Sequence, residues 1–486
     1  MELFKRYNHL GFHNPYYTKR DDNLIVKRDF EQALLDLDDS DRILDYTALV
    51  EVFSTGFCFS DRTLIKGLWK SPWMARPDAN MADWDFYDVP RHFEKRLEKQ
   101  TIVDTFYSVL KNELYDYIRP HKNIGLLLTG GMDSRIVAGI LRSLEEAGEI
   151  DGKRIFTFTW GHELSRDVIY AQKIAKKFKW EWEHLVVDVG QLEQNCNIAI
   201  ENGCEFTPIH LHAMPKVADK EYLDCVLAGS FGDSVGRAEF SGIKVRGLGN
   251  LMSKISNIGG ILRYDFRDFT MSEIAEDIEK YHRIFPQSHL YQQYEQDQQL
   301  HYMRRMLNAC MNTINNKTSL FQMFSAPSVF GFMWSLHPDL RGDWIYYKLI
   351  EKYFPEILPI PWARTGLPYY RDEGTPDQYL KKHHDYGSMI RNYFMDYVEN
   401  ALAKNREIAK SLFDLRAIDK LMRNLKKYPI AGGLLYEDRL LYVGQVLNFV
   451  QRYNIHIDLK PSKQTMIPSL TQDLKYKAKY FYKKVR

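Results

Sequence analysis

The turn at residues 129–134, Thr-Gly-Gly-Met-Asp-Ser, contains the residues best suited to chemistry. It follows the short apolar run 124–128 and precedes residues with helical spacing. Two consecutive glycines let a ligand approach the backbone closely, and free amide groups at a helix start bind anions. A lone carboxylate would repel phosphate there, so Asp133 predicts a divalent cation, magnesium, shared with phosphate oxygens. The hydroxyl groups of Thr129 and Ser134 would be further donors. The alternative is a tight turn that only caps a helix.

The elements that must position this turn alternate between strands and helices. Apolar runs predict strands over residues 124–128, 155–159, 184–187 and 224–228. Helical spacing predicts helices from 134 towards 141 and over 166–178. This alternation is typical of an α/β fold, a parallel sheet with helices on both faces. Because ligands bind such sheets at the carboxyl ends of the strands, the turns after strands one, two and four form the candidate site.

The chain divides into three expected parts. Residues 1–90 mix apolar runs with turn signals and predict a short, irregular, partly β lead-in. Residues 91–261 hold the alternating pattern, with a helix over 103–118 before the first strand. In residues 262–486 strand signals fade, and helices are expected over 270–281, 298–313, 389–402 and 437–453. The basic tail from Asp473 predicts a solvated amphipathic helix, with contact to an anionic partner as the alternative.

The composition excludes several classes of protein. The 486 residues are 45% hydrophobic and carry a net charge of +2, which argues against nucleic acid or a membrane surface as partner. The five cysteines show no CxxC spacing, so neither a zinc site nor a disulfide framework is indicated. No apolar stretch approaches the roughly 20 residues of a membrane span. We therefore expect a cytoplasmic protein without a transmembrane segment.

The turn resembles the Ser-Gly-Gly-x-Asp-Ser pyrophosphate loop (PP-loop) of the N-type ATP pyrophosphatases. The synthetase domain of glutamine-dependent asparagine synthetases is the most similar member. Three further segments are similar to this family in the same order: 158–161 (Phe-Thr-Trp-Gly), 227–234 (Leu-Ala-Gly-Ser-Phe-Gly-Asp-Ser) and 358–366. The resemblance extends over residues 45–450. The Walker pattern, by contrast, does not occur in the sequence.

The resemblance implies an adenine nucleotide alpha hydrolase-like sheet that binds ATP and Mg²⁺. It implies that Asp133 and Asp233 bind magnesium and that Arg364 stabilises the charge on the departing pyrophosphate. These three are therefore the expected catalytic residues. The implied reaction activates a carboxylate as an acyl-adenylate, from which ammonia or an amine forms an amide. The expected nucleotide contacts are Leu128, Thr129, Gly130, Gly131, Asp133, Ser134, Thr159, Trp160, Gly161 and Gly229.

Several positions depart from the family pattern. Glutamine-dependent members carry a cysteine after the initiator methionine, where this chain has Glu2. Residues 1–90 are therefore interpreted as the remnant of a glutaminase-type domain, and ammonia would come from solution or from a separate glutaminase, unless another amine is used. Ser230 and Ser234 stand where the family has an acidic or tyrosyl residue and a glutamate. Aspartate as substrate is thus in doubt, and sugar, peptide and small-molecule carboxylates remain open. Arg364 replaces the usual lysine and can still bind pyrophosphate.

Two other functions remain open. A catalytically weakened relative would bind nucleotide and act with a partner protein, as Ser230 and Ser234 suggest. A tRNA-modifying enzyme with the same loop is disfavoured by the missing cysteine pair and the near-neutral charge. Some candidates also have structural interpretations: structural histidines for His210 and His212, paired or solvated side chains for Arg135 and Arg166, and a core position for Trp160.

Overall fold

A five-stranded sheet lies at the centre of the computed structural model, which describes residues 14–87, 90–237, 250–263, 266–369, 371, 373–430, 434–458 and 475–482. Its strands are β6 (Asn123–Leu127), β7 (Arg154–Trp160), β8 (Glu181–Leu185), β9 (Cys225–Ala228) and β10 (Ser319–Gln322). The order is β10-β9-β6-β7-β8, and all neighbours are parallel. The chain runs outward from β6 in one direction and then in the other, so the order reverses between β6 and β9. Open parallel sheets bind ligands at this reversal point.

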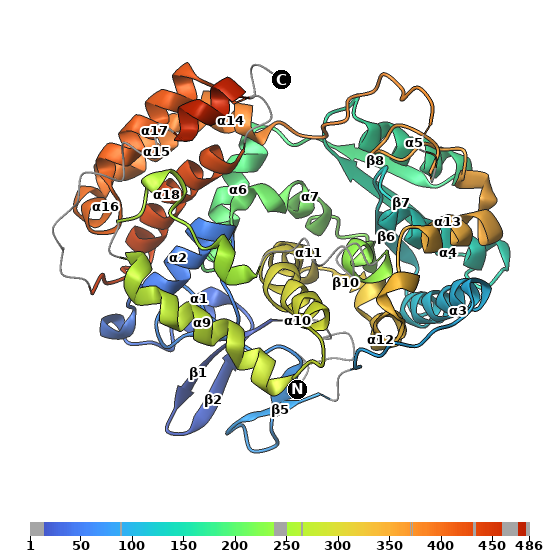
Figure 1. The fold of residues 1–486 in the computed structure, drawn as a ribbon, viewed down its shortest axis with the longest axis horizontal. Coiled ribbons are helices and arrows are strands. Elements are labelled where there is room, and N and C mark those ends of the chain that lie inside the picture. Colours follow the sequence, from blue (N-terminus) through green and yellow to red (C-terminus); the bar gives the residue numbers. More distant parts are fainter. Residues whose placement is uncertain are drawn as a thin grey trace.

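Helices cover both faces of the sheet, as the sequence predicts (Figure 1). On one side lie α3 (Lys99–Ile118), α4 (Asp133–Glu146), α5 (Arg166–Phe178), α12 (Pro327–Ser335) and α13 (Trp344–Tyr353). The other side carries α6 (Val189–Glu201), α7 (Met214–Ala218) and α11 (Ala309–Asn315). Leu126 packs into the first of these cores and Leu127 into the second. Because both faces are buried, β6 is apolar at nearly every position.

The beginning of the chain shares a core with its end. The strands β1 (Tyr16–Arg20), β2 (Asn23–Lys27) and β3 (Trp69–Lys70) form a small antiparallel sheet, and β4 (Ala75–Pro77) pairs with β5 (Trp84–Phe86). Helices from both ends bury apolar residues in one core: α1 (Phe30–Leu34), α2 (Tyr46–Thr55), α9 (Phe266–Ile284), α15 (Met395–Lys404), α17 (Leu415–Lys427) and α18 (Leu435–Arg452). This shared core lies beside the sheet (Figure 1).

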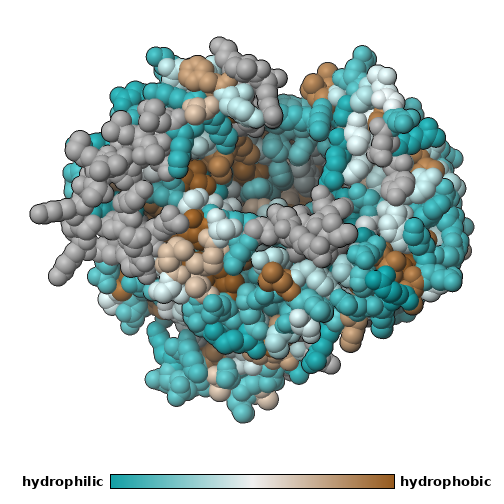
Figure 2. Space-filling view, viewed as in Figure 1, coloured by the Kyte–Doolittle hydropathy of each residue, from teal (hydrophilic) through white to brown (hydrophobic). Residues whose placement is uncertain are grey.

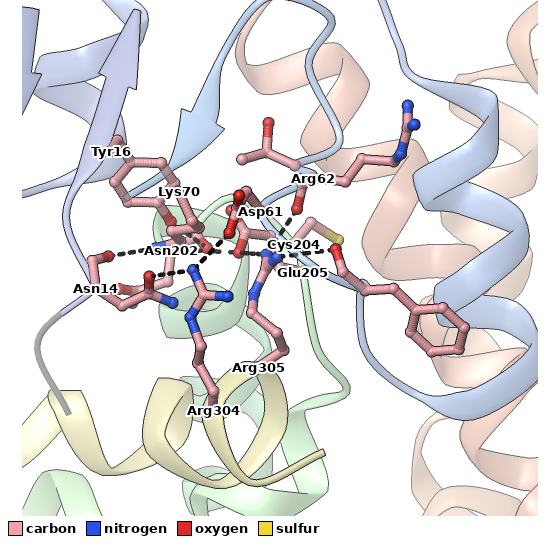
Figure 3. Close-up of polar contacts among 12 residues, drawn as sticks. Asn14, Tyr16, Asp61, Arg62, Lys70, Asn202, Cys204, Glu205, Arg304 and Arg305 are labelled. Atoms are coloured by element: carbon pink, nitrogen blue, oxygen red, sulfur yellow. Dashed lines mark hydrogen bonds and ion pairs between the residues drawn. The ribbon is translucent and has the colours of Figure 1, made fainter. Parts of the chain in front are cut away.

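A buried network of charged groups fastens the shared core to the sheet half of the molecule (Figure 3). Arg304 and Arg305 lie on the π-helical segment η7 (Gln298–Asn308) and are fully buried. Arg304 Nη2 is 2.9 Å from Asp61 Oδ1, and Arg305 Nη2 is 2.7 Å from Glu205 Oε2. Lys70 Nζ lies 4.0 Å from the same oxygen of Glu205. The network therefore joins residues before the sheet, between β8 and β9, and after β9.

Most predicted elements are confirmed with shifts of a few residues; α5, for example, occupies the predicted 166–178. The C-terminal part is mainly helical, as predicted. It also contributes one strand that the sequence did not indicate, β10, which completes the sheet by pairing with β9. The helix expected over 298–313 is π-helical to Asn308 and α-helical beyond it, and that over 389–402 is split into α14 (Tyr386–Tyr393) and α15. The division at residues 90 and 261 stays a prediction.

The basic tail is described only over residues 475–482, which are helical, with Tyr476 buried. Within the described ranges, no helix combines the length and apolar character that crossing a membrane requires.

Candidate active site

The loop between β6 and α4 is shaped by its own hydroxyl groups. The amide of Gly131 donates to Thr129 Oγ1 (3.0 Å), and the amide of Thr129 donates to Ser134 Oγ (3.1 Å). The two hydroxyl oxygens are 3.1 Å apart. These bonds curl the loop over the first turn of α4, so its backbone amides gather at the carboxyl end of β6. Ser134 is buried and its hydroxyl holds the loop in shape, while its expected contact with the nucleotide stays a prediction.

Two glycines let neighbouring segments touch this loop. A Cβ atom on Gly130 would lie 2.8 Å from the carbonyl oxygen of Arg166. A Cβ atom on Gly229, which follows β9, would lie 2.5 Å from the amide nitrogen of Ser134. The structure thus brings the predicted Gly130, Gly131 and Gly229 together where the strand order reverses, which is the expected position for a ligand.

Asp133, the expected metal ligand, is paired with an arginine that the sequence analysis missed. Arg237 donates from Nε to Asp133 Oδ1 (2.9 Å) and from Nη2 to Oδ2 (3.3 Å). Its Nη1 donates to Asp343 Oδ1 (3.3 Å). Burial alone would lower the pKa of Arg237, but the two carboxylates raise it overall, so the guanidinium stays charged. In the sequence, the feature that could have indicated a role for Arg237 is its position on the turn that carries Asp233.

Asp233 lies at the same edge of the sheet, in the turn η4 (Gly232–Gly236) that follows β9. Its Oδ1 accepts from the amide of Ser234 (2.7 Å). Phe231 precedes the turn with φ +66°, a left-handed conformation that is unusual for a large side chain. In the part of the chain that the structure describes, no group of three or more His, Cys, Asp or Glu side chains is placed to hold a metal ion. The predicted magnesium ligands Asp133 and Asp233 therefore remain a prediction.

Arg364 is brought to the loop by the turn that carries it. The amide of Ala363 donates to the carbonyl oxygen of Gly130 (3.1 Å). Arg364 itself is exposed, and its guanidinium carbon lies 4.6 Å from the ring centroid of Trp362. The residue expected to face pyrophosphate thus stands next to the loop, although 230 positions of sequence separate the two.

Arg135 and Arg166 are paired residues that support the loop from behind, as the structural interpretation predicted. Arg135 is fully buried and donates to the carbonyl oxygens of Ile360 (2.6 Å) and Pro361 (2.8 Å). Burial lowers its pKa to about 10. Arg166 Nε lies 3.1 Å from Asp377 Oδ1. Both arginines tie the loop and the start of α5 to the segment that carries Arg364.

The end of β7 provides a backbone surface rather than side-chain donors. The hydroxyl of Thr159 is buried, donates to the carbonyl oxygen of Leu128 (2.7 Å) and accepts from the indole of Trp182 (3.1 Å). Trp160 is half-buried, with its ring near-parallel to that of His212 at 5.8 Å. Gly161 has φ +123°, and a Cβ there would lie 2.5 Å from a backbone oxygen. The Thr159 hydroxyl is thus occupied by protein partners, and the expected nucleotide contacts of Thr159, Trp160 and Gly161 stay a prediction.

Figure 2 shows the surface hollowed between the α5–β8 side and the α14 side of the molecule. The amide of His162, just beyond β7, donates to the carbonyl oxygen of His383 (2.7 Å). A segment from the C-terminal part therefore crosses to the end of β7 and borders this hollow.

Comparison with known proteins gives the family of the central part. The asparagine synthase family model matches residues 108–316, which include the loop, Asp233 and Arg237. Residues 108–316 are an asparagine synthase-like synthetase domain. The match relates this domain to ATP-using ligases and transferases. The match covers less than half of the chain and ends before Arg364.

No curated protein matches the chain. Among solved structures, the U34-tRNA thiolase NcsA from Methanococcus maripaludis with its [4Fe-4S] cluster is similar at 15% identity, over 45% of this chain and 78% of that chain. Its TM-score is 0.21, which is too low to support a conclusion.

Four histidines gather beside the end of β7, two from the asparagine synthase-like domain and two from the C-terminal part. His212 lies within 5.7–6.5 Å, between ring centroids, of His210, His383 and His384. Its Nδ1 is 2.8 Å from the hydroxyl oxygen of Tyr386. Burial lowers the pKa of His210 to about 4 and that of His384 to about 3, so both are neutral at pH 7. The structural interpretation of His210 and His212 fits this packing.

Proposed function

We propose that the chain is an ATP-dependent ligase that forms AMP and pyrophosphate while joining a carboxylate to ammonia or an amine. One observation carries the proposal: two segments distant in sequence close on the PP-loop. Gly229 packs on the first turn of α4, and the amide of Ala363 donates to Gly130. A triphosphate seated on the loop amides would have the β9 turn on one side and the turn with Arg364 on the other.

The reaction would proceed in two steps. A carboxylate oxygen of the substrate attacks the α-phosphorus of ATP, and the bond to the β-phosphate oxygen breaks, with pyrophosphate keeping the electron pair. The amine nitrogen then attacks the acyl carbon, AMP leaves with the C–O electron pair, and a proton passes to water. The loop amides position the phosphates, and Arg364 neutralises the charge that grows on pyrophosphate.

A magnesium ion that accompanies ATP would neutralise phosphate charge, with Asp233 as its protein ligand. Asp133 already accepts from Arg237 at both carboxylate oxygens, so it would share its charge between Arg237 and any ion that binds there. One carboxylate is sufficient, since magnesium in nucleotide sites commonly keeps several waters and binds one or two carboxylates plus the phosphates.

The substrate acid is proposed to be other than aspartate. The hydroxyl of Ser230 donates to Met311 Sδ (2.9 Å), and that of Ser234 is directed to the carbonyl oxygen of Phe231 (3.4 Å). Neither side chain supplies the negative charge that would hold the ammonium group of an amino acid. We therefore propose a sugar, peptide or other small-molecule carboxylate, with ammonia from solution or from a separate glutaminase.

Oxygen-18 transfer tests this function. The protein would be incubated with ATP, magnesium, hydroxylamine and a panel of ¹⁸O-labelled carboxylic acids. We expect one acid to give a hydroxamate and to transfer one ¹⁸O to the phosphate of AMP, because the carboxylate oxygen becomes the bridging atom of the adenylate. Arg364→Met should lower the rate by about 10²–10³-fold. Formation of ADP with ¹⁸O in inorganic phosphate would contradict the proposal.

Nucleotide binding without turnover is the second candidate. It is favoured by the pairing of Asp133 with Arg237, which engages a carboxylate that the active family is expected to give to a metal. ATP binding measured by calorimetric titration, with no AMP formed from any acid in the oxygen-18 experiment, would support this candidate.

A further inference from the structure

Arg237 occupies the centre of the candidate site, yet the proposed reaction gives it no role. It is only 3% exposed. Its guanidinium spans two carboxylates from different elements: Asp133, the first residue of α4, and Asp343, which directly precedes α13. The pairing with Asp133 engages both carboxylate oxygens in the fork geometry that favours arginine over lysine.

The turn that carries Arg237 is pressed against its neighbours. A Cβ atom on Gly232 would lie 2.4 Å from Asp133 Cβ, and one on Gly236 would lie 2.0 Å from the hydroxyl oxygen of Tyr346. That hydroxyl donates to the carbonyl oxygen of Gly232 (3.1 Å). The backbone of the turn therefore has little room to move away from α4, and Arg237 is held at the loop rather than extended into solvent.

Trp362 connects Arg237 with Arg364. The guanidinium carbon of Arg237 lies 5.7 Å from the Trp362 ring centroid, and that of Arg364 lies 4.6 Å from it. Tyr369 meets the same ring edge-on at 5.3 Å. Because the next residue, Ala363, is bonded to Gly130, the indole holds two positive charges beside the phosphate loop. Cation–π contact with tryptophan is the strongest of its kind among the aromatic residues.

We infer that Arg237 is a built-in cation of the phosphate site, which supplies at Asp133 the positive charge that the sequence assigns to magnesium. The inference rests on the proposed function, because it assumes a nucleotide on the loop. Without Arg237, Asp133 and Asp343 would place two negative charges next to a triphosphate and repel it. With Arg237 in place, Asp133 is neutralised before the nucleotide arrives. Nucleotide binding should therefore depend only weakly on a divalent ion.

Calorimetric titration with α,β-methylene-ATP tests this role without turnover. The wild-type protein is titrated in magnesium and in EDTA, and the same pair of measurements is made on Arg237→Gln and Arg237→Lys. Arg142→Gln is the matched control, since Arg142 lies near the end of α4 opposite to Asp133 and pairs with Glu145 and Glu146 of that helix. Thermal melting of each variant, measured without nucleotide, establishes that it is folded.

We expect EDTA to weaken wild-type binding by less than about fivefold. Arg237→Gln should bind about 10- to 100-fold more weakly than wild type in EDTA and regain part of that loss in magnesium, because the ion can then occupy Asp133. Arg237→Lys should lie between the two, and Arg142→Gln should match wild type.

Two results would overturn the inference. The first is wild-type binding that requires magnesium, with a loss of more than about 100-fold in EDTA. The second is an Arg237→Gln variant that binds as wild type does in EDTA, which would leave Arg237 a purely structural pair. Absence of wild-type binding under both conditions would instead refute the proposed function.

Discussion

At the scale of single residues, the loop at residues 129–134 depends on glycine positions where a Cβ atom would not fit. Gly229 belongs to another strand than the loop, yet a Cβ atom there would overlap the backbone of Ser134 at 2.5 Å and that of Asp133 at 2.7 Å. A methyl group at this position would clash with backbone atoms, so rotation of a side chain could not relieve the clash. The loop would have to shift as a whole.

Gly229→Ala should therefore weaken binding of α,β-methylene-ATP by at least about tenfold and lower the free energy of unfolding by about 1–3 kcal/mol. Gly190→Ala is the control, because its Cβ would meet only one oxygen at 3.6 Å. Titration and urea unfolding measure the two effects. Binding by Gly229→Ala equal to that of wild type would show that the loop tolerates the shift.

The sequence identifies residues of this loop by type but not by partner. Two glycines before an aspartate and a serine are sufficient to predict an anion site, and the structure places Gly229 beside it. Arg237 was missed because its partner Asp133 lies 104 positions away, so no spacing rule connects them. For the same reason the partners of the Thr159 hydroxyl, Leu128 and Trp182, could not be predicted.

At the scale of elements, the loop is fastened to the segment that carries Arg364. The Arg135 guanidinium donates to the carbonyl oxygens of Ile360 and Pro361 and, at 3.4 Å, to that of Gly130. One buried side chain thus donates hydrogen bonds both to the loop and to the segment that leads to Arg364. The contact made by Arg135, and not the side chain of Arg364 itself, therefore sets the position of Arg364.

The variants Arg135→Met and Arg364→Met should separate the support of the turn from the contact with pyrophosphate. Arg135→Met leaves buried carbonyl oxygens without a donor and should lower the free energy of unfolding by about 2–4 kcal/mol. It should also weaken inhibition by pyrophosphate, because Arg364 loses its support. Arg364→Met should weaken pyrophosphate inhibition by about 10- to 100-fold with no change in melting temperature. An Arg135→Met variant with wild-type melting and inhibition would contradict this account.

Elements with a strong local pattern were predictable, and those defined by tertiary contact were not. In α5 the residues Val168, Ala171, Ile174, Ala175 and Phe178 are all buried on one face, so the helical period identifies both ends. The strand β10 has four residues, too few for a period, and owes its conformation to parallel pairing with β9. The break between α14 and α15 at Phe394 likewise leaves the apolar spacing nearly unchanged.

At the scale of the whole molecule, a buried charge network holds the two halves together, and Lys70 is its weakest member. Its ammonium lies 3.3 Å from the ring centroid of Tyr16 and donates to the carbonyl oxygen of Asn14 (3.2 Å). Burial lowers the pKa of Lys70 to about 7, even though Glu205 opposes the shift. At neutral pH the network therefore holds a lysine that is only partly protonated.

The stability of the protein should rise with pH between about pH 7 and pH 9. Unfolded lysine keeps its proton up to about pH 10.4, so in this range the unfolded state binds more protons than the folded state, and deprotonation favours folding. The expected gain is about 1–3 kcal/mol in urea unfolding. Lys70→Met should lack this slope, whereas the exposed Lys426→Met should retain it. Parallel pH profiles for wild type and Lys70→Met would rule out this role for Lys70.

The core formed by residues from α2 and α18 also has a consequence for biosynthesis. Its N-terminal half leaves the ribosome long before its partner exists, because Leu49 and Val446 belong to the same cluster. At a translation rate of roughly 5–20 residues per second, the early apolar surface waits on the order of tens of seconds. During that interval the surface lacks its partner and is prone to aggregation, so truncation near the C-terminus should produce aggregation rather than a smaller folded protein.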